Sequence, residues 1–214
     1  MSDIKAVVFD MDGVLIDSES LCDIIWGKVA QEMQLENILS CITACRGLNR
    51  KDSVEILKQF YGPDFDGYAF LDRCSELFME VEASDGVPLM PYVKETLEYL
   101  SKKYILCVAS STRKIHVLRE LEEVGVAKYF KTFTTGDEVE HGKPDPEIYI
   151  KACKSIGCSP DQCVGIEDSF NGVRSSVAAG LKTIMIPDRV PANDEMKSIA
   201  WKICTSMKDV QCIL

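Results

Sequence analysis

The chain is 214 residues long, 46% hydrophobic and 27% charged, with a formal net charge of −10. This length allows one domain with an insertion or two small domains, and the composition is typical of a folded protein in water. The negative charge argues against nucleic acid or an anionic membrane as a partner. We find no secretory signal and no apolar run long enough to span a bilayer, so we expect a cytoplasmic protein. We also expect a monomer.

Ten cysteines raise the question of disulfides or a metal site. None of them forms a CxxC pair, and only two histidines are present to supplement them. Cys107 and Cys163 lie inside apolar strand-like runs, which is typical of small core residues. We therefore expect reduced cysteines rather than disulfides or a zinc site.

The first part of the chain is predicted to be one strand followed by helices. Residues 4–9 form an apolar, β-branched run that predicts a buried strand. Residues 18–34, 51–60 and 68–81 carry apolar side chains at helical spacing. A group of turn residues at 84–88 then separates this helical segment from the rest of the chain.

From residue 92 onward the pattern changes to alternating helices and strands. We predict helices at 92–102, 113–124, 145–157 and 170–179, and strands at 104–109, 132–135, 163–166, 183–186 and 202–205. This alternation predicts an α/β fold with a doubly wound, parallel-sheet (Rossmann-like) core. Residues 1–16 and 86–214 would form that core, and residues 17–85 would be an inserted all-helical cap. A cap inserted at this point can act as a mobile lid, whereas an inert helical decoration is the simpler alternative.

Polar residues follow four of the predicted strands. They are Asp10 and Asp12 after the first strand, Ser110, Ser111 and Thr112 after the second, Lys143 after the third, and Glu167 and Asp168 after the fourth. Because the carboxyl ends of parallel strands meet at one edge of a sheet, we expect these side chains to surround one point. Carboxylates that lie this close repel one another unless a cation or a shared proton relieves them. Taken singly, each could be a solvated turn, a helix cap or a solvated lysine.

These motifs, in this order, resemble those of the haloacid dehalogenase superfamily of phosphotransferases. The family's DxDG[TV] motif and the aspartate that follows it are matched by Asp10, Asp12 and Asp17; its Ser/Thr motif by Ser110; its GKPxP lysine by Lys143; and its [DE]D motif by Glu167 and Asp168. The resemblance covers essentially the whole chain. The position of the helical insertion is similar to that in the branch containing β-phosphoglucomutases and phosphatases.

The resemblance implies a phosphatase that hydrolyses small phosphate monoesters, with sugar phosphates expected, through an aspartyl-phosphate intermediate. Asp10 would be the nucleophile and Asp12 the general acid and base. Mg²⁺ would be held by Asp10, the backbone carbonyl of Asp12 and Asp168, with Glu167 as a ligand or an outer partner. Ser110, Ser111 and Lys143 would hold the phosphoryl oxygens.

The cap is where the resemblance leaves alternatives open. Arg46 and Arg50 match basic residues of mutase-like members and could bind a second anionic group of the substrate, although Arg50 could equally be a solvated helix residue. Mutase members carry a histidine where this chain has Cys22, which favours hydrolysis over a β-phosphoglucomutase-type hexose-phosphate mutase. A phosphoryl-accepting signalling receiver is a third alternative, but receivers carry the acceptor on the third strand and have no helical insertion.

Overall fold

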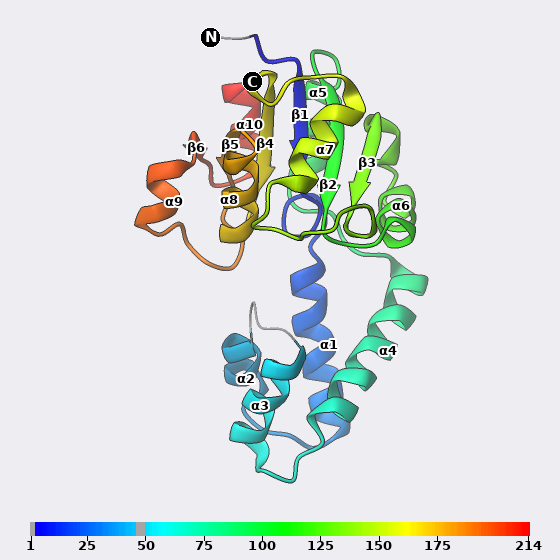
Figure 1. The fold of residues 1–214 in the computed structure, drawn as a ribbon. Helices are drawn as coiled ribbons and strands as arrows, with labels where there is room; N and C mark the ends of the chain where they lie inside the picture. Colours follow the sequence, from blue (N-terminus) through cyan, green and yellow to red (C-terminus); the bar gives the residue numbers. More distant parts are fainter. Residues whose placement is uncertain (1–2, 46–49) are drawn as a thin grey trace. The chain divides into compact units, whose positions relative to one another are not determined.

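The computed structural model describes residues 3–45 and 50–214, and these divide into two compact units. One unit consists of residues 3–17 and Pro88–Leu214 and contains the sheet. The other consists of the described residues of Ser18–Val87 and is helical (Figure 1).

The sheet has six parallel strands within the described residues, in the order β3-β2-β1-β4-β5-β6. They are β1 (Ala6–Phe9), β2 (Ile105–Ser110), β3 (Thr132–Thr135), β4 (Cys163–Glu167), β5 (Lys182–Met185) and β6 (Lys202–Ile203). The apolar run of β1 is fully buried because a strand lies on each side of it and helices cover both faces of the sheet. This arrangement confirms the predicted doubly wound α/β fold.

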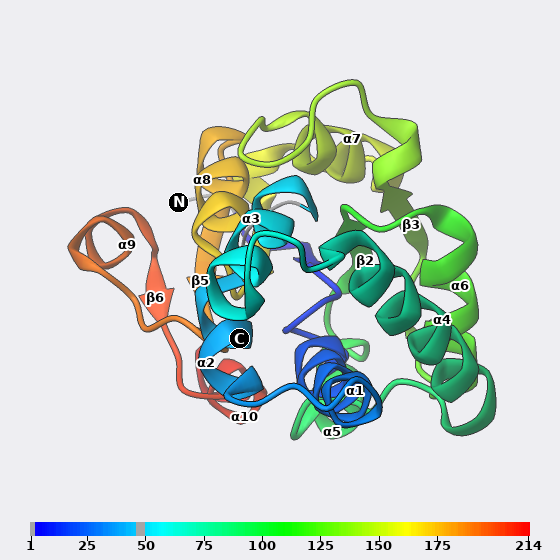
Figure 2. The same ribbon diagram turned by 90° about the horizontal axis from the view of Figure 1, so that it is seen from below.

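The helices of this unit are α5 (Val93–Leu100), α6 (Lys114–Glu123), α7 (Glu147–Ile156), α8 (Phe170–Ala178), α9 (Asp194–Ile199) and α10 (Met207–Ile213). Helices α7 and α8 lie on one face of the sheet, and α5 and α10 on the other (Figure 2). Helix α7 packs Ile148, Tyr149 and Ala152 against apolar residues of β1, β2 and β4. The short helices α9 and α10 were not predicted from the sequence, and the last strand is two residues shorter than expected.

The helical unit contains α1 (Ser18–Glu32), α2 (Ile38–Cys45), α3 (Arg50–Tyr61) and α4 (Gly67–Asp85). Helix α1 packs against α2 and α4, and α3 packs against the same two helices. Trp26 of α1 meets Phe70 of α4 edge to face, with ring centroids 5.1 Å apart. Helix α2 was not predicted from the sequence. Among the described residues, no helix combines the length and the apolar character that a membrane span requires.

The two connections to the helical unit are tied together within the α/β unit. The backbone N–H of Asp17 donates to the carbonyl oxygen of Pro88 (2.8 Å), and the N–H of Met90 donates to that of Leu15 (3.0 Å). The outgoing and returning segments are therefore fixed to each other at the point where the chain leaves the sheet.

Candidate active site

The register of the sheet brings the ends of three strands together. Phe9 of β1 is paired with Val108 of β2 and with Ile166 of β4, so Asp10, the next residue, lies beside the ends of both neighbouring strands. The backbone N–H of Asp10 also donates to the carbonyl oxygen of Ile166 (2.9 Å). A side chain at this position faces the edge where parallel sheets bind their ligands.

Lys143 joins these strand ends. Its ammonium group donates to Asp10 Oδ1 (2.6 Å), Glu167 Oε1 (2.7 Å) and the carbonyl oxygen of Ala109 (3.1 Å). These three acceptors match the three protons of an ammonium group, which fixes its orientation. Burial alone would lower the pKa of Lys143, but the carboxylates of Asp10 and Glu167 outweigh it and raise that pKa, so the lysine stays charged.

Three carboxylates gather around this lysine. Oxygen atoms of Asp10, Glu167 and Asp168 all lie within 4.8 Å of one another. Burial, together with these neighbouring charges, raises the pKa of Asp10 to about 7 and that of Asp168 to about 9. Lys143 supplies one positive charge against three carboxyl groups, so the cluster favours a further cation. Carboxylate oxygens are the ligands that Mg²⁺ prefers, and the donor set therefore fits this metal.

Glu167 is held from both ends of its carboxylate. The hydroxyl group of Tyr149 donates to Oε1 (2.7 Å), the oxygen that also accepts from Lys143. On the other side, Oε2 accepts from the backbone N–H of Asp168 (3.2 Å) and from the N–H and hydroxyl of Ser169 (3.4 and 3.2 Å). Sequence reasoning missed Tyr149, whose place in the apolar pattern of its helix indicated only a core residue.

Asp12 is paired with the hydroxyl group of Thr112, the last residue of the predicted Ser-Ser-Thr run. Thr112 Oγ1 donates to Asp12 Oδ2 (3.0 Å), and the N–H of Thr112 donates to Ser110 Oγ (3.0 Å). Ser110 is fully buried at the end of β2, whereas Ser111 is exposed. The Ser-Ser-Thr run after β2 was the signal in the sequence. Its third residue, Thr112, is the one that contacts Asp12.

Two glycines allow the backbone to approach these carboxylates closely. Gly13 has a φ of 74°, and a Cβ there would lie 2.5 Å from Asp168 Oδ2. A Cβ at Gly172, in α8, would lie 2.0 Å from the carboxyl group of Glu167. Neither position accepts a side chain unless a carboxylate moves.

The predicted cap residues belong to the helical unit. Arg46 lies outside the described residues. Arg50, at the start of α3, binds the carboxylate of Asp72 and the carbonyl oxygen of Tyr68, and its guanidinium lies 5.9 Å from the centroid of the Tyr68 ring. Arg50 also lines a pocket of about 410 Å³ within this unit. The other lining residues are mostly apolar and include Cys22 of α1.

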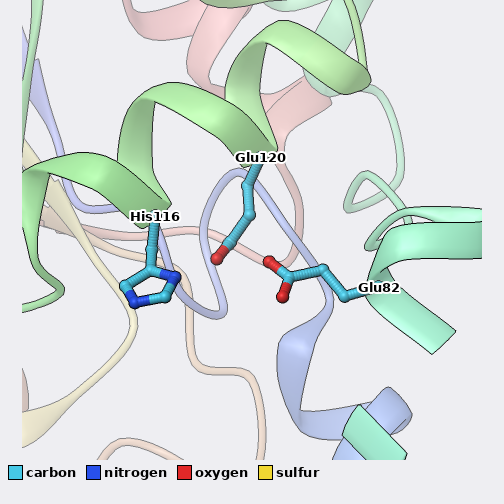
Figure 3. Close-up of side chains that lie close together, drawn as sticks. All are labelled: Glu82, His116 and Glu120. Carbon is cyan, nitrogen blue, oxygen red and sulfur yellow. The ribbon is translucent and has the colours of Figure 1, made fainter. Parts of the chain in front are cut away.

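Neither histidine belongs to the carboxylate cluster of Asp10, Glu167 and Asp168. His116 and Glu120 stand one turn apart on α6 and point to the same side of that helix (Figure 3). His141 is exposed, with its Nδ1 3.4 Å from Glu147 Oε2. Among the described residues, the cluster therefore consists of carboxyl groups and includes no imidazole.

Comparison with known proteins places this geometry in a family. A model of haloacid dehalogenase-like hydrolases matches residues 7–186. The phosphorylated carbohydrates phosphatase of Thermotoga maritima is 33% identical over 181 residues, which cover 84% of this chain and 83% of that protein. Hexitol phosphatase B of Escherichia coli is 27% identical over 198 residues, covering 89% of this chain and 87% of that protein.

A solved structure agrees with this assignment. A Thermotoga maritima protein assigned provisionally as a beta-phosphoglucomutase has a TM-score of 0.82 and 27% sequence identity, covering 98% of both chains. The matches in sequence and in structure both extend over most of the chain, as the motif resemblance predicted. The chain therefore belongs to the haloacid dehalogenase-like hydrolase family.

Proposed function

We propose that this chain is a Mg²⁺-dependent phosphatase that hydrolyses small phosphate monoesters, with phosphorylated sugars as the expected class, through an aspartyl-phosphate intermediate. The observation that carries the proposal is the ammonium of Lys143, held 2.6 Å from Asp10 Oδ1 and 2.7 Å from Glu167 Oε1 at the carboxyl edge of the sheet. Relatives named as phosphatases of carbohydrates and hexitols support the substrate class.

The reaction would proceed as two displacements at phosphorus. An oxygen of Asp10 attacks the phosphorus atom, the ester P–O bond breaks, and Asp12 gives its proton to the leaving oxygen. Asp12 then takes a proton from water, whose oxygen attacks the phosphorus of the aspartyl phosphate. The P–O bond to Asp10 breaks, which releases inorganic phosphate and restores the Asp10 carboxylate. Lys143 and the hydroxyl of Ser110 stabilise the phosphoryl oxygens as their charge redistributes.

Thr112 gives Asp12 a defined position for this work. Its hydroxyl donates to Asp12 Oδ2 (3.0 Å), which restrains the orientation of the carboxyl group. A general acid must lie within hydrogen-bonding reach of the leaving oxygen, so a fixed rotamer raises the fraction of productive encounters.

Mg²⁺ would be held by the carboxylates of Asp10 and Asp168 and by the backbone carbonyl of Asp12, with Glu167 as an outer partner. Both oxygens of Glu167 already accept hydrogen bonds from other residues, which supports that outer role. When bound, the metal would neutralise charge on the phosphate and the nucleophile.

The helical unit would serve as the cap and contribute to substrate choice. Arg50 can form charge-assisted hydrogen bonds with an anionic or polyhydroxylated group once it exchanges its contact with Asp72. A hexose-phosphate mutase is the alternative, and the relative assigned provisionally as a beta-phosphoglucomutase favours it. Cys22 favours hydrolysis, because a neutral thiol is a weaker donor than the histidine of mutase-like members.

The deciding experiment measures release of inorganic phosphate from sugar, polyol and nucleotide monophosphates with Mg²⁺ or with EDTA. We expect Mg²⁺-dependent release that is fastest with a sugar or polyol phosphate and is absent in Asp10→Asn. A second assay supplies β-glucose 1-phosphate with a trace of the 1,6-bisphosphate. Stoichiometric glucose 6-phosphate without free phosphate would establish the mutase, and no turnover of any ester would overturn both.

The covalent intermediate has its own test in Asp12→Asn with p-nitrophenyl phosphate. The leaving group of this ester needs little protonation, so the first displacement should survive while the second stalls. We expect a burst of one nitrophenolate per enzyme followed by slow turnover. A linear progress curve with no burst would contradict the proposed division of labour.

A further inference from the structure

A tyrosine hydroxyl is buried beneath the carboxylate cluster. Tyr149 lies in α7, is fully buried and packs among apolar residues of β1, β2 and β4. Phenylalanine would supply the same packing without the cost of burying a hydroxyl group. That hydroxyl instead donates to Glu167 Oε1 over 2.7 Å, and burial raises the pKa of Tyr149, so it remains a donor.

Tyr149 touches both members of the ion pair at the centre of the site. Its hydroxyl shares Glu167 Oε1 with Lys143, and its ring lies under the ammonium of Lys143, 5.2 Å from Nζ to the ring centroid. A cation over the face of a ring is attracted to it, and the attraction is larger where water is excluded. One side chain therefore holds the carboxylate through its edge and the ammonium through its face.

The shared oxygen controls where the ammonium lies. Glu167 Oε1 accepts two hydrogen bonds, and Oε2 accepts hydrogen bonds from Ser169. The Glu167 carboxylate is therefore held in one orientation beside Lys143. The hydroxyl also withdraws negative charge from Oε1, which weakens its attraction for the ammonium. Lys143 is thus kept in position against Asp10 rather than being drawn fully onto Glu167.

We propose that Tyr149 is a positioning residue, which acts through Glu167 to fix the ammonium of Lys143 at Asp10. The proposal rests on the proposed function, since it concerns the lysine that would stabilise the phosphoryl group. Tyr149 itself touches no reacting atom. Its hydroxyl acts only through the hydrogen bond that it donates to Glu167.

Tyr149→Phe tests this role because it removes the hydroxyl and keeps the ring. We expect kcat to fall about tenfold, as the loss of one hydrogen bond to a charged group predicts, with a smaller change in KM. The matched control is Tyr104→Phe. Tyr104 is half-buried in the α/β unit, and its hydroxyl donates to a main-chain oxygen of Leu214 (3.0 Å), so we expect this variant to keep the wild-type kcat.

A double-mutant cycle separates positioning from simple packing. If Tyr149 acts through Glu167, then Tyr149→Phe should lower kcat little further in a Glu167→Gln background. Kinetics are measured well below the melting temperature of each variant. A kcat of Tyr149→Phe within twofold of wild type, or fully additive effects in the cycle, would overturn the proposal.

A structural readout keeps the test independent of turnover. Crystal structures of wild type and Tyr149→Phe, grown under the same conditions with Mg²⁺, would give the distance from Lys143 Nζ to Asp10 Oδ1. We expect this distance to lengthen beyond hydrogen-bonding range, or the lysine to occupy two positions. An unchanged lysine overturns the positioning role. Inactivity of the wild type on every ester overturns the proposed function and leaves this structural result to stand by itself.

Discussion

The ion pairs of Lys143 in the α/β unit and of Arg50 in the helical unit differ in their exposure to water. In the α/β unit the Lys143 side chain is 9% exposed, and its partners Asp10 and Glu167 are 11% and 0% exposed. In the helical unit the side chains of Arg50 and Asp72 are 45% and 65% exposed. If the Arg50–Asp72 pair breaks, water hydrates both charged groups at little cost in free energy. The buried charges of Lys143, Asp10 and Glu167 cannot be hydrated in this way.

This difference separates two tasks that a hydrolase of esters must perform. A buried ammonium held by three acceptors provides charge at a fixed point and needs little reorganisation during the reaction. A solvated guanidinium such as that of Arg50 can exchange its carboxylate partner for a ligand at little cost. We infer that the α/β unit is built for chemistry and the helical unit for recognition.

The nucleophile gives the largest expected effect. Asp10→Asn should lower turnover by at least about 1,000-fold, because an amide is neither a nucleophile nor an anionic ligand. The matched variant in the helical unit is Glu32→Gln, which loses one of the exposed partners of Arg73 and should keep turnover within about twofold. Phosphate release by purified proteins checks both. Substantial turnover by Asp10→Asn, with contaminating phosphatase excluded, contradicts the mechanism.

Removal of the cation from each kind of ion pair tests the comparison through stability. Lys143→Met leaves Asp10 and Glu167 buried without their counter-charge and should lower the free energy of unfolding by about 3 kcal/mol at pH 8. Arg73→Met breaks exposed pairs with Glu32, Glu76 and Glu80 and should cost much less stability than Lys143→Met. Urea unfolding of the metal-free proteins measures both. Equal losses would show that burial does not distinguish the two units.

Much of this site could be predicted from the sequence because it follows from strand order alone. Asp10, Ser110 and Glu167 each stand at the end of an apolar run, and parallel strands bring such ends to one edge. Lys143 was recognisable from the rigid Gly-Lys-Pro setting in which it lies. The structure adds the distances between these side chains.

Contacts that depend on how a helix is rotated were beyond the sequence pattern. Periodicity places Tyr149 on the buried face of α7, but the packing of that helix on the sheet decides that its hydroxyl meets Glu167. Thr112 and Asp12 were both expected at one edge of the sheet, but the pattern did not show which hydroxyl of residues 110–112 meets Asp12. Helix α2 was missed because its sequence, ILSCITAC, is apolar at most positions and has no charged face to mark a helical period.

Two helical glycines, Gly172 of the α/β unit and Gly27 of the helical unit, differ in how tightly neighbouring atoms enclose them, and alanine substitution measures this. Gly172→Ala places a Cβ 2.0 Å from the Glu167 carboxyl group, which several hydrogen bonds hold in place, and should cost about 2 kcal/mol or more and lower kcat. At Gly27 of α1 a Cβ would meet no neighbouring atom within 4 Å, so Gly27→Ala should stabilise by about 0.5–1 kcal/mol. Opposite signs in thermal unfolding are expected, and destabilisation by both would contradict the comparison.

The smallest expected effect is a pH dependence near neutral pH, which we expect from the carboxyl groups of the α/β unit. Burial and neighbouring charges raise the pKa of Asp10 from its ordinary 3.8 to about 7 and that of Asp168 to about 9. The native state then binds more protons than the unfolded chain above pH 4, so the free energy of unfolding falls as the pH rises toward these values. In the helical unit, Arg73 lowers the pKa of Glu32 from its ordinary value of 4.5. Titration of Glu32 therefore changes the free energy of unfolding only below about that pH.

Melting curves at pH 5.5 and pH 8 in EDTA should therefore show lower stability at the higher pH. Asp168→Asn should reduce this difference because it removes one of the two raised carboxyl groups, whereas Glu32→Gln should leave the difference unchanged. Added Mg²⁺ should raise the melting temperature more at pH 8 than at pH 5.5, since a dication favours the ionised carboxylates. A metal-free protein that is more stable at pH 8, or a Mg²⁺ effect that persists undiminished in Asp168→Asn, would contradict the placement of the cation among these carboxylates.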